Sequence, residues 1–164
     1  LRAGPRHARV VPTDLASELR AAVRAAQVRA RRQQVRLLLE PPDGPLPVQA
    51  DTRDLGRLLS RLLTLATDAS PAGGEVRVAA SLRGDAVRVE LFDDGPALPE
   101  GYAERAFDPF APPEPAQGRP GIGLSLAICR EQAMQLDGHV GLAPAPSGPG
   151  ALFWISLPLR PTGP

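Results

Sequence analysis

The chain has 164 residues but no lysine, no asparagine and only one cysteine. A single cysteine excludes an internal disulfide framework and is typical of proteins from a reducing cytoplasm. The net charge of +1 favours neither nucleic acid nor an acidic partner. No apolar run is long enough to span a bilayer, so we expect no membrane contact by this domain. The missing asparagines also remove the amide oxygens that often serve as ligands of hard metal ions.

The spacing of apolar residues predicts an alternation of helices and strands. Helices are expected to begin after Thr13 or Asp14, after Asp51, and at Ile122. Strands are expected at residues 35–40, 46–50, 76–80, 87–91, 139–142 and 152–157. We interpret residues 1–11 as the remnant of an upstream linker, residues 12–159 as one domain, and residues 160–164 as a tail.

Two short motifs indicate a nucleotide site. Asp93, Asp94 and Gly95 follow a strand-like run, which would place a carboxylate at a strand end facing a pocket. The segment from Gly118 to Leu124 carries three glycines at the start of an apolar helical run. Such glycines are typical of backbone that packs closely against a phosphate at a helix N-terminus.

The two motifs are separated by a loop rich in proline and glycine, Gly95 to Pro120, in which no period survives. A loop of this length in a compact domain is typical of a functional lid. We expect Phe107 and Phe110 to pin it to the core, with its most irregular part between Ala111 and Arg119. Its prolines favour a lid that is partly ordered without ligand.

The order of these elements and motifs resembles the catalytic, ATP-binding domain of sensor histidine kinases. That domain belongs to a larger group that includes gyrase-type and heat-shock chaperone ATPases. The resemblance covers Pro12 to Leu159, with Asp93 to Pro99 similar to the first glycine box and Gly118 to Leu124 to the second. Phe107 to Phe110 is similar to the phenylalanine box of the lid. The expected fold is an α/β two-layer sandwich, with a mixed, mostly antiparallel sheet of about five strands and three main helices on one face.

The resemblance implies roles for individual residues of the two glycine boxes. Asp93 would read adenine, and the nucleotide would be surrounded by Gly95, Gly118, Gly121, Gly123 and Leu124. Ala97 replaces a family glycine, and its methyl is expected to crowd the base at a cost of about 1 kcal/mol. Pro120 replaces a small hydroxyl residue and has no N–H to offer an oxyanion. Arg119 is a candidate phosphate contact, but we interpret it as a solvated lid residue.

The helix that carries the family's two asparagines departs furthest from the pattern. The asparagines, which help to hold magnesium, fall on Arg61 and Leu65, and a family basic residue falls on Asp68. Arg61 and Leu65 supply no oxygen ligand, and Asp68 would repel a triphosphate. One route to phosphate binding remains, in which Arg61 pairs directly with phosphate oxygens in place of the metal. ATP is therefore expected to bind weakly, and magnesium binding is in doubt.

These departures favour an eroded, pseudokinase-like domain of a sensor histidine kinase with weak or no ATP binding. The alternative is a fully working ATP-dependent protein-histidine phosphotransferase domain with unusual ligands; a serine-kinase anti-sigma factor of the same fold is more distant. No residue is assigned a certain catalytic role, and His7 is not expected to be the phosphoacceptor. The implied partners are the dimerisation and histidine-bearing hairpin of the parent chain, which can be membrane-anchored, and indirectly a response regulator.

Overall fold

A computed structural model describes residues 9–107, 119 and 122–160 of the chain. Its elements, in chain order, are β1 (Val11–Asp14), α1 (Leu15–Arg32), β2 (Arg36–Leu39), β3 (Pro47–Ala50), α2 (Thr52–Ala69), β4 (Glu75–Arg83), β5 (Ala86–Phe92), α3 (Tyr102–Arg105), α4 (Ile122–Gln135), β6 (His139–Pro144) and β7 (Ala151–Pro158).

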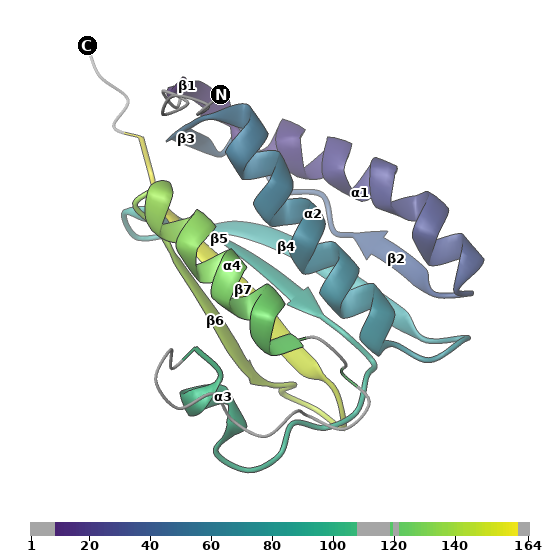
Figure 1. Ribbon diagram of the computed structural model, residues 1–164. Coiled ribbons are helices and arrows are strands. Elements are labelled where there is room, and N and C mark those ends of the chain that lie inside the picture. The colour runs from purple at the N-terminus through teal and green to yellow at the C-terminus, as the bar shows by residue number, and fades with distance from the viewer. Residues whose placement is uncertain (1–8, 108–118, 120–121, 161–164) are drawn as a thin grey trace, which may run out of the picture.

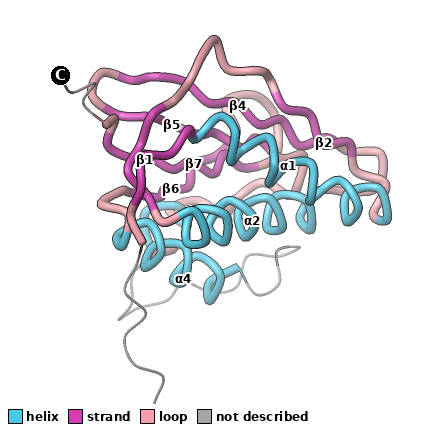
Figure 2. Tube along the Cα trace, turned by 90° about the horizontal axis from the view of Figure 1, so that it is seen from above, coloured by secondary structure: helices cyan, strands magenta, loops and turns pink. Residues whose placement is uncertain are grey.

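The main sheet has five strands in the order β2-β4-β5-β7-β6. Strands β2 and β4 run parallel, whereas the other three pairs in this sheet are antiparallel. Helices α1, α2 and α4 form one layer on one face of the sheet (Figures 1 and 2). The predicted two-layer sandwich, with its mixed sheet and three main helices on one face, is confirmed.

The core lies between the central helix α2 and the sheet. Asp51 caps α2, as predicted, by accepting hydrogen bonds at Oδ1 from the backbone N–H groups of Arg53 and Asp54. Five leucines at helical spacing are at most 1% exposed: Leu55, Leu58, Leu59, Leu62 and Leu63. They pack in one core cluster with the inward residues of β4 and β5. This burial fixes which face of α2 is left for a ligand.

A small second sheet at the N-terminal end differs from the expectation. β1 pairs with β3 in a separate antiparallel pair, so residues 47–50 do not join the main sheet. Asp14 explains this arrangement, because its Oδ1 accepts from Ala16 N–H at the start of α1 and from Leu46 N–H just before β3. One carboxylate therefore caps α1 and holds the second strand beside the first.

The loop after β5 contains a short helix, α3, that no sequence period had indicated. Tyr102 in α3 is 2% exposed and belongs to the core cluster, and Phe107 packs partly buried against that cluster. Arg130 of α4 donates to the Phe107 carbonyl oxygen at 2.8 Å. The expected anchoring by Phe107 is therefore seen, whereas Phe110 and residues 111–118 lie outside the described part of the chain. None of the helices in the described ranges is both long and apolar enough to cross a membrane.

The turn between β6 and β7 yields a stability prediction. Gly148 and Gly150 both have positive φ angles, of 72° and 120°. A Cβ at Gly150 would meet the backbone carbonyl oxygen of Asp93, but one at Gly148 would meet nothing within 4 Å. We expect Gly150→Ala to lower the free energy of unfolding by about 1 to 3 kcal/mol more than Gly148→Ala does. Urea unfolding of the two variants measures this difference, and equal losses would contradict the close approach.

Candidate nucleotide site

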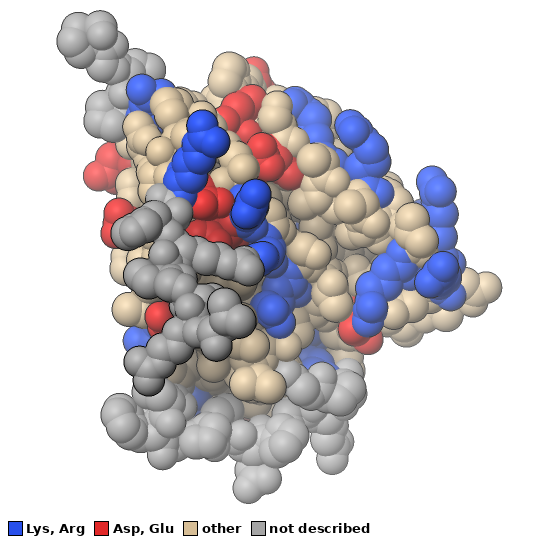
Figure 3. Space-filling model, turned by 45° about the horizontal axis from the view of Figure 1, so that its top comes forward, with Lys and Arg blue, Asp and Glu red and all other residues tan. Residues whose placement is uncertain are grey.

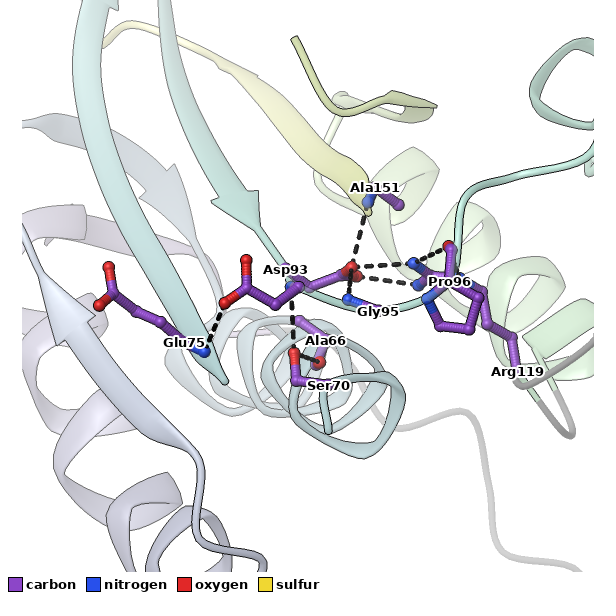
Figure 4. Close-up of polar contacts among 9 residues, drawn as sticks. Ala66, Ser70, Glu75, Asp93, Gly95, Pro96, Arg119 and Ala151 are labelled. Atoms are coloured by element: carbon purple, nitrogen blue, oxygen red, sulfur yellow. Dashed lines mark hydrogen bonds and ion pairs between the residues drawn. The ribbon is translucent and has the colours of Figure 1, made fainter. Parts of the chain in front are cut away.

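Asp93 lies directly after β5, as the sequence predicted, and its carboxylate is buried. The residue is 3% exposed. Its Oδ1 accepts hydrogen bonds from the N–H of Gly95 at 2.9 Å and of Ala151 at 3.0 Å. Gly95 belongs to the loop that follows, and Ala151 is the first residue of β7. The carboxylate therefore ties the end of β5 to the start of its neighbouring strand (Figure 4).

The same carboxylate is also paired with Arg119. The guanidinium donates from Nη1 to Oδ2 and from Nη2 to Oδ1, both at 2.8 Å. Nη2 and Nε also donate to the carbonyl oxygen of Pro96, at 2.8 and 3.3 Å. The two side chains are 1% and 0% exposed. The interpretation of Arg119 as a solvated residue was wrong, because its side chain is a buried, bidentate partner of Asp93.

This ion pair bears on the adenine-reading role that the resemblance implies for Asp93. A carboxylate reads an exocyclic amine by accepting its hydrogen bonds. Here both oxygens already accept from the Arg119 guanidinium, and Oδ1 also accepts from two backbone N–H groups. Charge-assisted bidentate bonds are stronger than bonds to a neutral amine. An incoming adenine would have to displace a buried guanidinium and leave its charge without a partner.

The first glycine box is also fixed from its other side. Asp94 Oδ2 accepts from Glu75 N–H at 2.8 Å, and the Asp94 N–H donates to Ser70 Oγ at 3.3 Å (Figure 4). A Cβ at Gly95 would lie 2.8 Å from the Ala69 carbonyl oxygen and 2.8 Å from Arg119 Nη2. Glycine is therefore required at position 95 so that the loop can pass between the end of α2 and the guanidinium.

Beside this ion pair, a cavity of about 690 Å³ lies between α2 and α4. This volume is within the range of small-molecule sites. Ten of its lining residues come from one face of α2, Arg119 comes from the lid end, and Ile122 and Ser125 come from α4. Arg61, Leu65 and Asp68 all line the cavity, so the structure brings together the three positions predicted from the asparagine helix.

The two positions where the resemblance places magnesium-binding asparagines hold residues that do not fit that role. Arg61 and Leu65 offer no oxygen, and the cavity's one carboxylate is already used. Asp68 Oδ2 accepts from Arg29 Nη2 at 2.7 Å, and its Oδ1 accepts from Arg29 Nε and Gln33 Nε2. Partial burial opposes ionisation of Asp68, but the hydrogen bonds from Arg29 and Gln33 and the charge of Arg29 lower its pKa overall. Among the described residues, no cluster of three metal-ligating side chains is present.

The expected repulsion between Asp68 and a phosphate is correspondingly reduced. Arg29 of α1 forms an ion pair with Asp68. The sequence did not predict this pair, because the two residues lie 39 positions apart.

The other predicted site residues are less involved in the cavity. Ala97 is exposed and does not line the cavity, Gly123 has open space where a Cβ would be, and Leu124 is 74% exposed. Gly118, Pro120 and Gly121 lie outside the described residues.

Sequence reasoning missed two further arginines of the cavity. Arg53 and Arg57 line it together with Arg61, at intervals of four residues along α2. This interval places the three side chains on one face of the helix. The four-residue spacing of these arginines can be seen in the sequence. Only the structure shows that their face of α2 lines the cavity.

Comparisons of this chain with known proteins agree on one protein family. Residues 50–161 match the family described as "Histidine kinase-, DNA gyrase B-, and HSP90-like ATPase". The chain is 34% identical over 116 residues to the sensor protein KdpD of Escherichia coli (strain K12), covering 71% of this chain and 12% of KdpD. It is 34% identical over 122 residues to the histidine-protein kinase/phosphatase MprB of Mycobacterium sp. (strain KMS), covering 71% of this chain and 24% of MprB.

Solved structures agree with these matches. A structure of a mycobacterial sensor histidine kinase MprB superposes with a TM-score of 0.74 at 27% identity, covering 93% of this chain and 99% of that chain. The chain spans only 12% of the length of KdpD and 24% of the length of MprB. The match therefore concerns one domain of those longer proteins.

The buried ion pair generates a prediction about stability. Arg119→Met leaves a charged carboxylate buried without its partner, so we expect a loss of about 3 to 5 kcal/mol in the free energy of unfolding. Adding Asp93→Asn to this variant should recover at least about half of the loss, because a neutral amide oxygen still accepts from Gly95 and Ala151. Chemical unfolding of both variants measures the two values.

A matched control is the exposed pair between Arg29 and Asp68, whose side chains are 52% and 39% exposed. Arg29→Met should cost less than about 1 kcal/mol, because water screens such a pair. If Arg119→Met costs no more than Arg29→Met, the pair does not hold the site as described.

Proposed function

The chain belongs to the histidine kinase-, DNA gyrase B- and HSP90-like ATPase family, and on this premise we propose that its nucleotide site is eroded. In this proposal the chain is the catalytic, ATP-binding-type domain of a sensor histidine kinase that binds ATP weakly or not at all. Within the longer parent protein it would serve two-component signalling through its fold and its contacts more than through phosphoryl transfer.

The proposal rests mainly on the bidentate ion pair between Asp93 and Arg119. The family position that reads adenine holds a carboxylate whose two oxygens accept four hydrogen bonds from within the chain. Oδ1 accepts three of these bonds and Oδ2 accepts one, and the side chain is fully buried, so adenine could not reach the carboxylate unless this network opens. Base recognition would therefore require breaking a buried ion pair that is 1% exposed at most.

The phosphate side of the cavity supports the same conclusion. Transfer of a γ-phosphoryl group depends on positioning and on neutralising charge, for which the family uses a metal ion. The positions of the two family asparagines hold Arg61 and Leu65, which cannot ligate magnesium. The chain's own residues can hold anionic oxygens there, but they cannot place a metal ion against them.

The proposed partners follow from the family and not from a contact in the structure. They are the dimerisation and histidine-bearing hairpin of the parent chain and, through that hairpin, a response regulator. A domain whose cavity does not open for adenine can still present the surface of its helices to such a hairpin. The lid end is held to the sheet by Arg119, which favours one fixed surface over a ligand-dependent one.

Calorimetric titration with ATP, with and without magnesium, tests the proposal. We expect either no binding or a dissociation constant in the millimolar range, with less than about a threefold gain from magnesium, because neither position of the family's asparagines supplies an oxygen ligand. Micromolar binding that depends strongly on magnesium would contradict the proposal and would support a working phosphotransferase domain with unusual ligands.

A repair series separates the two defects. Arg61→Asn with Leu65→Asn supplies amide oxygens but leaves Asp93 paired, so this double variant should still bind ATP no better than the parent protein. Adding Arg119→Ser frees the carboxylate, and the triple variant should gain at least about tenfold in magnesium-dependent affinity. Circular dichroism verifies folding before titration. If the double variant already binds magnesium-ATP tightly, then Arg119 does not block the base.

A further inference from the structure

We propose that the cavity between α2 and α4 binds a chain of phosphoryl groups directly on arginine side chains, without a metal ion and without reading a base. The inference rests on the proposed function, because it assumes that Asp93 is closed and that the asparagine positions hold no magnesium. It assigns the cavity a ligand class that fits the residues present. Two sources share this chemistry, the tail of any nucleoside triphosphate and free inorganic polyphosphate.

The first support is the arrangement of charge on α2. Arg53, Arg57 and Arg61 line the cavity on consecutive turns and span about 12 Å along the helix axis. Figure 3 shows arginine side chains spread over the helical face of the molecule. Guanidinium groups in a row match successive phosphoryl groups, since each can donate two parallel hydrogen bonds to anionic oxygens.

The second support is that this charge has few acidic partners in the cavity. The two other charged lining residues are each matched, Arg119 by Asp93 and Asp68 by Arg29. Arg53 lies near Asp51, whose pKa is lowered mainly by backbone hydrogen bonds and in small part by the Arg53 charge. Arg57 and Arg61 form no ion pair with any residue in the described ranges. The net charge available to a ligand is therefore positive.

The third support is the Arg61 side chain itself. Its Nε is buried and has no hydrogen-bond partner among the described residues. Burial raises the pKa of Cys129 on α4 to about 12, and the nearby charge of Arg61 acts against this rise. Arg61 therefore lines the cavity close to α4, and its guanidinium is incompletely paired among the described residues.

Titration calorimetry with sodium tripolyphosphate in EDTA tests the inference. We expect saturable binding that weakens with added salt and is at least as tight as the binding of ATP. Magnesium should weaken tripolyphosphate binding, because it neutralises the charge that the arginines contact. ATP, GTP and CTP should agree within about threefold, because no base is read. Absence of tripolyphosphate binding, tightening by magnesium, or a strong preference for ATP would each overturn the inference.

Paired variants locate the site. Arg57→Gln with Arg61→Gln should weaken tripolyphosphate binding by at least about tenfold, because two charge-assisted contacts are lost. Arg20→Gln with Arg24→Gln removes the same charge from exposed positions of α1 that do not line the cavity, and it should change affinity by less than about threefold. Equal losses of tripolyphosphate affinity in the two double variants would show non-specific attraction by positive charge. That result would overturn binding in the cavity.

The two proposals fail in different ways. If magnesium-ATP binds weakly and tripolyphosphate does not bind, the eroded site stands and the phosphate-chain inference fails alone. If magnesium-ATP binds tightly while tripolyphosphate does not, both fail. Thermal unfolding of each variant verifies that a lost signal reflects the missing arginines and not an unfolded chain.

Discussion

The buried pair of Asp93 and Arg119 determines how the parts of this site are arranged. It joins the end of β5, the start of β7 through Ala151, and the lid end that precedes α4. A buried ion pair adds little stability compared with apolar packing, but removing one partner is costly. The pair therefore acts mainly as a constraint, because Arg119 cannot move away from the sheet without leaving the Asp93 carboxylate without its charged partner.

This constraint divides the cavity into two chemically different ends. At one end the lining residue Arg119 is paired with Asp93, and under the proposed function this end has little to offer a base. The α2 wall carries three guanidinium groups, one of them (Arg61) at a position where the resemblance places a metal-binding amide, so this wall attracts anionic oxygens. In the proposed function, loss of base recognition and loss of the metal have related causes, since Arg119 pairs with Asp93 and Arg61 stands at one of the two asparagine positions.

Local patterns predicted much of the fold. The leucine spacing of α2, its Asp51 cap and the alternation in β4 and β5 all depend on neighbouring residues, and the order of the glycine boxes indicated the sandwich. Features that depend on residues far apart in the chain could not be predicted in this way. The pairing of β1 with β3, the contact between Arg29 and Asp68, and the burial of Arg119 are of this second kind. The residue types alone favoured a solvated Arg119, because an arginine in a proline-rich loop is usually exposed.

The most direct test of the account is the NMR spectrum of the Arg119 guanidinium, assigned by comparison with Arg119→Met and followed during addition of magnesium-ATP. A guanidinium held bidentately in a buried site rotates slowly, so we predict separate, slowly exchanging Nη–H signals that persist at saturating nucleotide. A single averaged signal without nucleotide would contradict the buried pair. Loss of the separate signals on adding magnesium-ATP would show that the nucleotide opens the pair, and the central claim would be wrong.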